Sequence, residues 1–430
     1  MFKTLKNAFT LPDIRKKLLF AAFIVIIYRI GCAIPVPYVS ADIQNIFASS
    51  SGSIFEYLTL ISGTAFAQAN LFALSISPYI NSSIIMQLLC VAIPALENMS
   101  KEEDGRKKIS QITRYVTVAI ALVTAYGYYM YLRNYGFLTD NSVFAGIVIV
   151  ACYTAGSSLI MWLGEKINEN GIGNGISIIL FVNIVSGAPQ GIISMVGSIA
   201  SGNVAAIISS ILTLVIVVAM AIFVIYITHS ERRLQVQYAK RVVGRKMYGG
   251  QSSTLPLKLN MAGVMPVIFA NSILALPSTV GMIFPPKEGS FWAGFLNAFS
   301  YNSWLYAVLF LVLIIAFSYF YIAISFNPIE VANNLKKQGG FLPGIRPGKP
   351  TSDYITKILN KVTLMGAFFL AGVAVLPLVV NLIYTMITKV SLGSVAFAGT
   401  SVIIVVGVAL ETYREIEAQM TMRHYKGFLE

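Results

Sequence analysis

The residues best suited to chemistry are few and scattered along this 430-residue chain. Its three cysteines, Cys32, Cys90 and Cys152, lie in apolar runs, and its two histidines, His229 and His424, lie in polar segments. An odd number of dispersed cysteines indicates neither a disulfide framework nor a zinc cluster. We therefore expect no metal and no cofactor, and we interpret the cysteines as small buried apolar side chains.

Motifs for hydrolysis or for ion coupling do not stand out either. We find no His-Glu-x-x-His, no aspartate pair and no serine with a histidine inside an apolar run, and no phosphate-binding glycine loop. We predict that the chain is not an enzyme and that its energy comes from a partner. A secondary transporter of small solutes is an alternative. Against it, Arg29, Glu165 and Glu411 are the main ionisable residues of the apolar runs and lie at or near their ends.

The composition excludes a soluble protein. Apolar residues make up 56% of the chain and charged residues 11%, and the mean hydropathy is +0.74. An ordinary soluble domain carries roughly 25% charged residues. So little charge cannot cover a soluble surface, so the bilayer must supply most of the solvent. We predict an all-α polytopic membrane protein.

Ten segments are long and apolar enough to cross a bilayer, which takes about 20 helical residues. The predicted spans are residues 18–36, 72–93, 112–132, 143–164, 175–197, 205–227, 262–284, 304–325, 362–387 and 392–411. Residues Val39–Ala41 faintly resemble a signal-peptide cleavage site. The length of the first run and the charge pattern favour an uncleaved span instead.

Basic residues orient these spans. With the N-terminus in the cytoplasm, 27 of the 31 Lys and Arg residues fall on the inner side, and only Arg133, Lys287 and Lys389 fall on the outer side. The remaining one, Arg29, lies in the first span. Because cytoplasmic connections carry the excess of Lys and Arg, we predict that both termini are cytoplasmic.

Ten spans divide into two groups of five near residue 200. An odd number per half inverts the second half relative to the first, as in many transport proteins. We expect an N-terminal half, residues 1–200, and a C-terminal half, residues 201–430. Two inner connections in the second half, residues 228–261 and 326–361, are long and basic. They could anchor the topology, bind anionic lipid or dock an anionic partner.

One outer segment, Ile54–Ala69, is apolar but too short and broken to cross. Glu56 lies near its start and Ser62 and Gly63 lie in its middle. It either re-enters the membrane from the outside, which requires a protein-lined cavity, or lies on the outer leaflet as an amphipathic helix. These features alone do not separate the two readings.

Six segments together resemble the SecY family, the channel subunits of the bacterial Sec protein translocase. They are Pro78–Leu89 (PYINSSIIMQLL), Gly105–Gln111 (GRKKISQ), Gly171–Ser177 (GIGNGIS), Leu255–Pro266 (LPLKLNMAGVMP), Pro343–Gly348 (PGIRPG) and Gly399–Ser401 (GTS). The resemblance runs from the first span to the last. It implies ten transmembrane helices in two inverted five-helix halves around a central hourglass pore.

The resemblance also implies where the pore is closed. Six aliphatic side chains would form a ring at its waist: Ile76, Ile80, Leu180, Ile184, Ile268 and Ile404. Leu180 departs from the isoleucine common in the family. A plug, roughly residues 54–67 with Ile54, Phe55, Leu58, Ile61, Ser62 and Gly63, would close the outer funnel. An aliphatic constriction excludes water and ions by dewetting.

By the same resemblance, spans 2 and 3 would face spans 7 and 8 across a lateral gate, with Gln87, Asn271 and Ser272 as its polar contact. Arg241, Arg245 and Arg346 in the long inner connections would dock cytoplasmic partners. The implied function is translocation of unfolded preproteins across the bacterial cytoplasmic membrane and lateral release of membrane helices into it. The implied partners are SecE, SecG, the SecA ATPase, the ribosome, signal sequences, nascent chains and the lipid bilayer.

Overall fold

The computed structural model of the chain is mostly helical. It describes residues 8–40, 66, 68–200, 204–238, 241–243, 246–248, 252–284, 286, 289–300, 303–388 and 398–426. Each of the ten predicted spans coincides, wholly or largely, with one of its helices. Apolar runs favour helices in a bilayer because a helix satisfies all its backbone hydrogen bonds internally.

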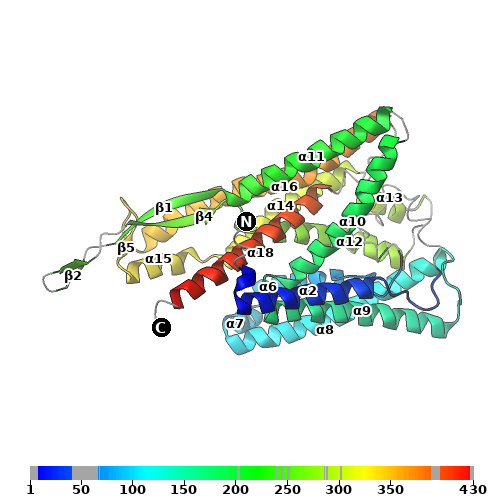
Figure 1. Cartoon of the computed structure of the whole chain (residues 1–430), viewed down its shortest axis with the longest axis horizontal. Helices are drawn as coiled ribbons and strands as arrows, with labels where there is room; N and C mark the ends of the chain where they lie inside the picture. The colour runs from blue at the N-terminus through cyan, green and yellow to red at the C-terminus, as the bar shows by residue number, and fades with distance from the viewer. Residues whose placement is uncertain are drawn as a thin grey trace.

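The helices of the first half are coloured blue to green in Figure 1, where the last of them runs obliquely away from the others. They are α2 (Pro12–Cys32), α6 (Ser77–Ala92), α7 (Pro94–Lys101), α8 (Glu103–Asn134), α9 (Val143–Asn170) and α10 (Gly175–Ala200). Helices α6 and α7 are bent by 105° at a break after Ala92. Pro94 occupies the first turn of α7, where its missing N–H leaves no bond unmade.

The second half contributes another group, coloured green to red. Its helices are α11 (Val204–His229), α12 (Met265–Ile283), α13 (Phe291–Ala298), α14 (Trp304–Ser325), α15 (Pro328–Lys337), α16 (Lys349–Thr388) and α18 (Ala398–Lys426). The two groups meet where α12 packs against α6 and α8, and where α10 packs against α18. A buried apolar core runs through both contacts and includes residues of α2, α6, α10, α12, α14, α16 and α18.

Length and apolarity identify the membrane-crossing helices. Seven helical stretches of the described chain are long and apolar enough to cross a membrane, or eight if the bent pair α6 and α7 counts as one span. The two further predicted spans, in α2 and α18, are also helical. The chain is a multi-pass membrane protein, and the count of ten is consistent with its helices.

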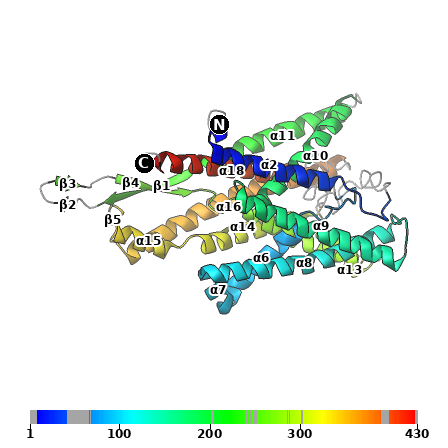
Figure 2. The same cartoon turned by 60° about the horizontal axis from the view of Figure 1, so that its bottom comes forward.

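The two long connections, residues 228–261 and 326–361, are not simple loops. Strand β1 (Glu231–Tyr238) pairs antiparallel with β4 (Ser252–Lys258), and β1 also pairs with the short β5 (Gly340–Phe341). Between β1 and β4, β2 (Arg241–Val243) pairs with β3 (Lys246–Tyr248). Figures 1 and 2 both show this sheet and α15 projecting from one end of the helix bundle. Leu234, Val236 and Leu257 pack the sheet against the start of α16.

The start of the second predicted span, residues 72–93, differs from the expectation. Residues 68–76, which we call the elbow, form consecutive turns, and α6 begins only at Ser77. Ala69 and Ser75 adopt positive φ angles of 50°, a region that side chains disfavour. The elbow is nevertheless almost fully buried, because polar side chains of neighbouring helices satisfy its backbone.

Candidate functional site

Three cavities follow one another through the middle of the bundle. The outer cavity is about 80 Å³ and is lined by α12 from Ile268 to Met282. The waist cavity, about 30 Å³, lies at the start of α12 around Met265 and Phe269. The inner cavity, about 420 Å³, opens among Lys258, Asn260 and the stretch of α18 from Ile403 to Ala418. The cavity in the middle is therefore the smallest of the three.

Shared side chains place the cavities in line. The outer and waist cavities share Ile80 from α6, Leu180 from α10 and Ile268 from α12. The waist and inner cavities share Asn174, Ser177 and Met265. The three aliphatic side chains therefore lie between the outer and waist cavities.

The six side chains predicted to form the ring lie in one apolar cluster. Five of them are buried there and Ile184 is partly buried against them. Ile80, Leu180, Ile268 and Ile404 line the outer cavity, whereas Ile76 and Ile184 line none of the three cavities. The structure thus brings the predicted ring together, with four members facing open space and two behind them.

Two helices place their ring residues in the same way. Helix α6 has Pro78 in its first turn and Ile80 two residues later, and α12 has Pro266 in its first turn and Ile268 two residues later. Proline is favoured in the first helical turn because its fixed φ suits the helix start. Each helix start thus carries its isoleucine to the constriction, one helix from each half of the chain.

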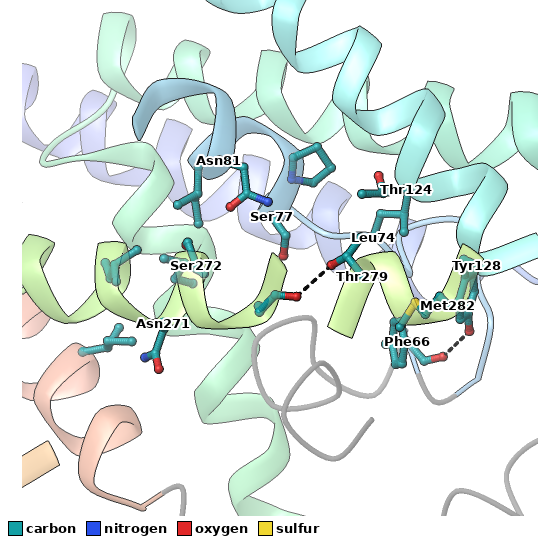
Figure 3. Close-up of a pocket in the computed structure, with 16 residues that line it drawn as sticks. Phe66, Leu74, Ser77, Asn81, Thr124, Tyr128, Asn271, Ser272, Thr279 and Met282 are labelled. Atoms are coloured by element: carbon teal, nitrogen blue, oxygen red, sulfur yellow. Dashed lines mark hydrogen bonds between the residues drawn. The ribbon is translucent and has the colours of Figure 1, made fainter. Parts of the chain in front are cut away.

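The predicted gate residues separate into two places. Asn271 and Ser272 line the outer cavity together with Asn81 and Thr124, and Figure 3 shows Ser272 on the side of α12 that faces Asn81. Asn271 is buried, and its Oδ1 accepts no hydrogen bond within the described chain. Gln87 is absent from this cavity lining, and its amide nitrogen donates to Ser83 Oγ at 3.3 Å.

The sequence interpretation missed Asn81 and Thr124. The signal was available, because Asn81 lies in the polar stretch after Pro78 and a polar side chain inside a span is rarely without a role. What the sequence does not contain is the angular position of each side chain about its helix. Asn81 lies six residues before Gln87, which is about 9 Å along a helix.

Arg346 lies exposed in a turn between β5 and α16. Gly344 and Gly348 flank it with φ angles of 81° and 104°, which favour glycine at both positions. Thr351 Oγ1 donates to the Arg346 carbonyl oxygen at 2.9 Å and holds the turn against α16. The guanidinium forms no ion pair with any residue of the described ranges.

The remaining predicted site residues lie wholly or partly outside the described part of the chain. Arg241 begins strand β2, where only its backbone is described, and Arg245 lies outside the described residues. The predicted plug residues Ile54, Phe55, Leu58, Ile61, Ser62 and Gly63 lie outside them as well. No group of three or more metal-ligating side chains occurs among the residues that the structure describes.

Charged side chains line the inner cavity, and of these only Glu411 was named from the sequence, as an ionisable residue near the end of a span. Lys258 from β4 lies there with Glu411, Arg414 and Glu415 from α18. Arg414 Nη2 donates to the Thr228 carbonyl oxygen at 2.8 Å, which ties α18 to the end of α11. Partial burial lowers the pKa of the Lys258 ammonium group, and the nearby Arg414 charge lowers it further.

The tapering cavities, the aliphatic constriction and the apolar helices define a helical membrane protein with the architecture of a channel. The sequence model described as SecY matches residues 70–413. The chain belongs to the SecY family.

Individual relatives agree with this assignment. The chain is 40% identical to "Protein translocase subunit SecY" of Streptomyces galbus over the whole of both chains. Its fold resembles a solved structure described as "The structure of a protein conducting channel", with a TM-score of 0.66, 18% identity, and 94% and 92% of the two chains covered. It also resembles "Sec61 in the Canine ribosome-channel complex from the endoplasmic reticulum", with a TM-score of 0.63, 17% identity and the same coverage.

Proposed function

We propose that this chain is a protein-conducting channel that passes unfolded preproteins across the cytoplasmic membrane of a bacterium. The observation that carries the proposal is the constriction of Ile80, Leu180 and Ile268 between the outer and waist cavities. Aliphatic side chains exclude water and ions by dewetting. They also deform around many polypeptide sequences without binding any one of them, as a channel for diverse substrates requires.

The same channel releases membrane helices sideways into lipid. The contact of α12 with α6 and α8 is the seam that must open, and it carries Asn81, Thr124 and Ser272 beside the outer cavity. Hydrogen bonds between membrane helices contribute about 1 kcal/mol each. Polar contacts of this strength bias the seam towards closure and still yield to an apolar signal sequence.

The halves of the channel are residues 1–200 and 201–430, related by inversion. The matching first-turn prolines and isoleucines of α6 and α12 support this division. The plug, about residues 54–67, closes the outer cavity in the resting state. With both termini in the cytoplasm, the sheet and Arg346 project on the cytoplasmic side.

Energy comes from partners, the SecA ATPase or a translating ribosome, which dock on the basic sheet and on the turn of Arg346. The exposed guanidinium presents a planar fork that suits a carboxylate or a phosphate. The similarity to a channel solved in a ribosome complex supports the ribosome as one partner. SecE and SecG complete the assembly in the membrane.

Reconstitution tests the proposal. Vesicles containing this chain with SecE and SecG should protect a preprotein from added protease only when SecA, ATP and an intact signal sequence are present. A matched preprotein that lacks its signal sequence should stay accessible. Uptake of small solutes without SecA, with no protected preprotein, would contradict the proposal and favour a secondary transporter.

A further inference from the structure

A chain of buried hydrogen bonds lies directly behind the aliphatic ring. Asn183 Nδ2 on α10 donates to Ser75 Oγ on the elbow at 2.8 Å. The Tyr28 hydroxyl on α2 donates to Asn183 Oδ1. Tyr28 and Ser75 are 0% exposed and Asn183 is 1% exposed, so solvent does not reach any of the three.

The positions of these residues connect the chain to the constriction. Ser75 immediately precedes Ile76, which is the N-cap residue of α6. Asn183 immediately precedes Ile184 and lies one turn after Leu180. A bond between Ser75 and Asn183 therefore joins the elbow that starts one ring helix to the middle of another.

The elbow is held from several other sides, so Ser75 is a fixed point. Ser157 Oγ on α9 donates to the Ser75 carbonyl oxygen at 3.3 Å, and Tyr153 donates to the Ala69 carbonyl oxygen at 2.9 Å. The Phe72 ring stacks on Tyr28 with ring centroids 5.6 Å apart. Helix α10 is tied to α9 at its start, where Gly175 N–H donates to Asn168 Oδ1 at 2.7 Å, and further along it meets its neighbours mainly through aliphatic side chains.

We propose that Tyr28, Asn183 and Ser75 are positioning residues that set the resting width of the pore. Tyr28 orients the Asn183 amide so that its nitrogen faces Ser75. The directed Asn183–Ser75 bond then holds Leu180 and Ile184 against Ile76 and Ile80. This inference deepens the proposed channel function and rests on it.

Hydrogen bonds suit the position behind the aliphatic ring for a physical reason. Apolar packing between membrane helices is not directional, whereas a buried hydrogen bond fixes both distance and angle. An unpaired amide at this depth is strongly disfavoured, so a small rotation of α10 is resisted. The bond is still weak enough to break when a polypeptide enters and the ring helices separate.

Two conservative substitutions test the proposal. Tyr28→Phe removes one hydroxyl and keeps the ring stacked on Phe72, and Ser75→Ala removes the acceptor at the elbow. Each should raise the resting ion conductance in planar bilayers about fivefold, the shift expected for losing one interhelical hydrogen bond. Because both act through the Asn183 amide, the double variant should leak little more than either single variant.

The matched control is Tyr129→Phe. Tyr129 is a buried tyrosine on α8 whose hydroxyl makes no hydrogen bond with the described residues. The conductance of Tyr129→Phe should equal that of the unchanged protein. All variants should give the same yield of assembled complex as the unchanged protein. Unchanged conductance in both test variants, a rise in only one of them, or additive rises would overturn the proposal. Failure of the unchanged protein to move any preprotein would instead count against the channel function itself.

Discussion

Gln237 and Phe341 lie opposite each other in an antiparallel ladder, although more than a hundred residues separate them in the chain. The pair joins β1 from the first long connection to β5 from the second. The two connections therefore form one sheet, with Leu342 and Ile345 packed in the same apolar cluster as Leu234. The two connections therefore share one apolar core.

A disulfide tests this pairing. Residues directly opposite in an antiparallel pair have Cβ atoms about 4.5–5.5 Å apart, which is near the range that a disulfide spans. Gln237→Cys with Phe341→Cys should crosslink on mild oxidation and leave SecA-driven export intact. Gln235→Cys with Phe341→Cys is the control, because Gln235 lies two residues along β1 from the position opposite Phe341. Equal crosslinking of both pairs, or export lost on oxidation, would contradict a permanent joint sheet.

The strands of this sheet were not predicted from the sequence. Leu234, Val236 and Tyr238 alternate with polar residues, and that alternation is typical of a half-buried strand. The Gly and basic residues of 228–261 indicate a loop, and this indication concealed the alternation. The partner strand β5 is only two residues long and could not be identified from its own sequence.

The membrane helices were easier to predict, because twenty apolar residues have few alternatives in lipid. Residues 304–325 coincide with α14. The elbow was not predictable in this way, since residues 72–76 are as apolar as a helix start. Its turns depend on groups far away in the sequence. Gly156, for example, lets α9 approach so closely that an added Cβ would lie 2.3 Å from the Leu71 carbonyl oxygen.

The ring should carry the permeability barrier. Replacing both Ile80 and Ile268 by Asn puts polar groups between the outer and waist cavities and wets the constriction. Resting vesicles that contain this variant should leak ions at least about tenfold faster than the unchanged channel. Ile85→Asn with Ile324→Asn is the control, because both side chains are exposed on the outside of the bundle. Full electrical resistance of the ring variant in planar bilayers would remove the barrier from this site.

The lateral gate should close across Asn81 and Ser272. Both line the outer cavity from facing helices, and α6 packs against α12. Cysteines at these two positions, joined by a short thiol-specific crosslinker, should block export, and a cleavable linker should restore it. The pair of Gln87→Cys and Ser272→Cys tests our sequence-based prediction that Gln87 faces this segment. If only the Gln87 pair crosslinks and blocks export, Asn81 is not part of the gate.

Lys258 should titrate at lower pH than is usual for a lysine. Partial burial disfavours its charged form, and the Arg414 charge adds to the effect, so its pKa lies below the usual value. At a given alkaline pH a larger fraction of Lys258 is the neutral amine, which is the form that acylating reagents attack. Its labelling, followed by mass spectrometry, should begin at lower pH than is usual for a lysine side chain. Arg414→Gln removes a nearby positive charge and should move the onset of Lys258 labelling to higher pH. If the onset does not move, Arg414 does not contribute to the lowered pKa of Lys258.

A substitution of Arg346 distinguishes docking of a partner from anchoring of the topology as the role of this connection. Anchoring depends on the summed bias of many basic residues, so one charge among 27 on the inner side would be dispensable. Docking depends on the individual side chain, and Arg346 is exposed in a turn fixed by Gly344, Gly348 and Thr351. Losing a buried charge-assisted contact across an interface costs about 2–5 kcal/mol, and a reversed charge adds repulsion.

We therefore expect Arg346→Glu to abolish export of a preprotein into vesicles with SecA and ATP, while membrane insertion and assembly with partner subunits stay normal. Arg346→Lys should fall between, because lysine keeps the charge but loses the planar fork. Lys337→Glu, on the exposed end of α15, is the matched control for a charge reversal in the same connection. Its export should stay close to that of the unchanged channel. Normal export by Arg346→Glu would show that this turn only anchors the topology. An anchor tolerates the reversal of one charge, whereas a docking contact does not.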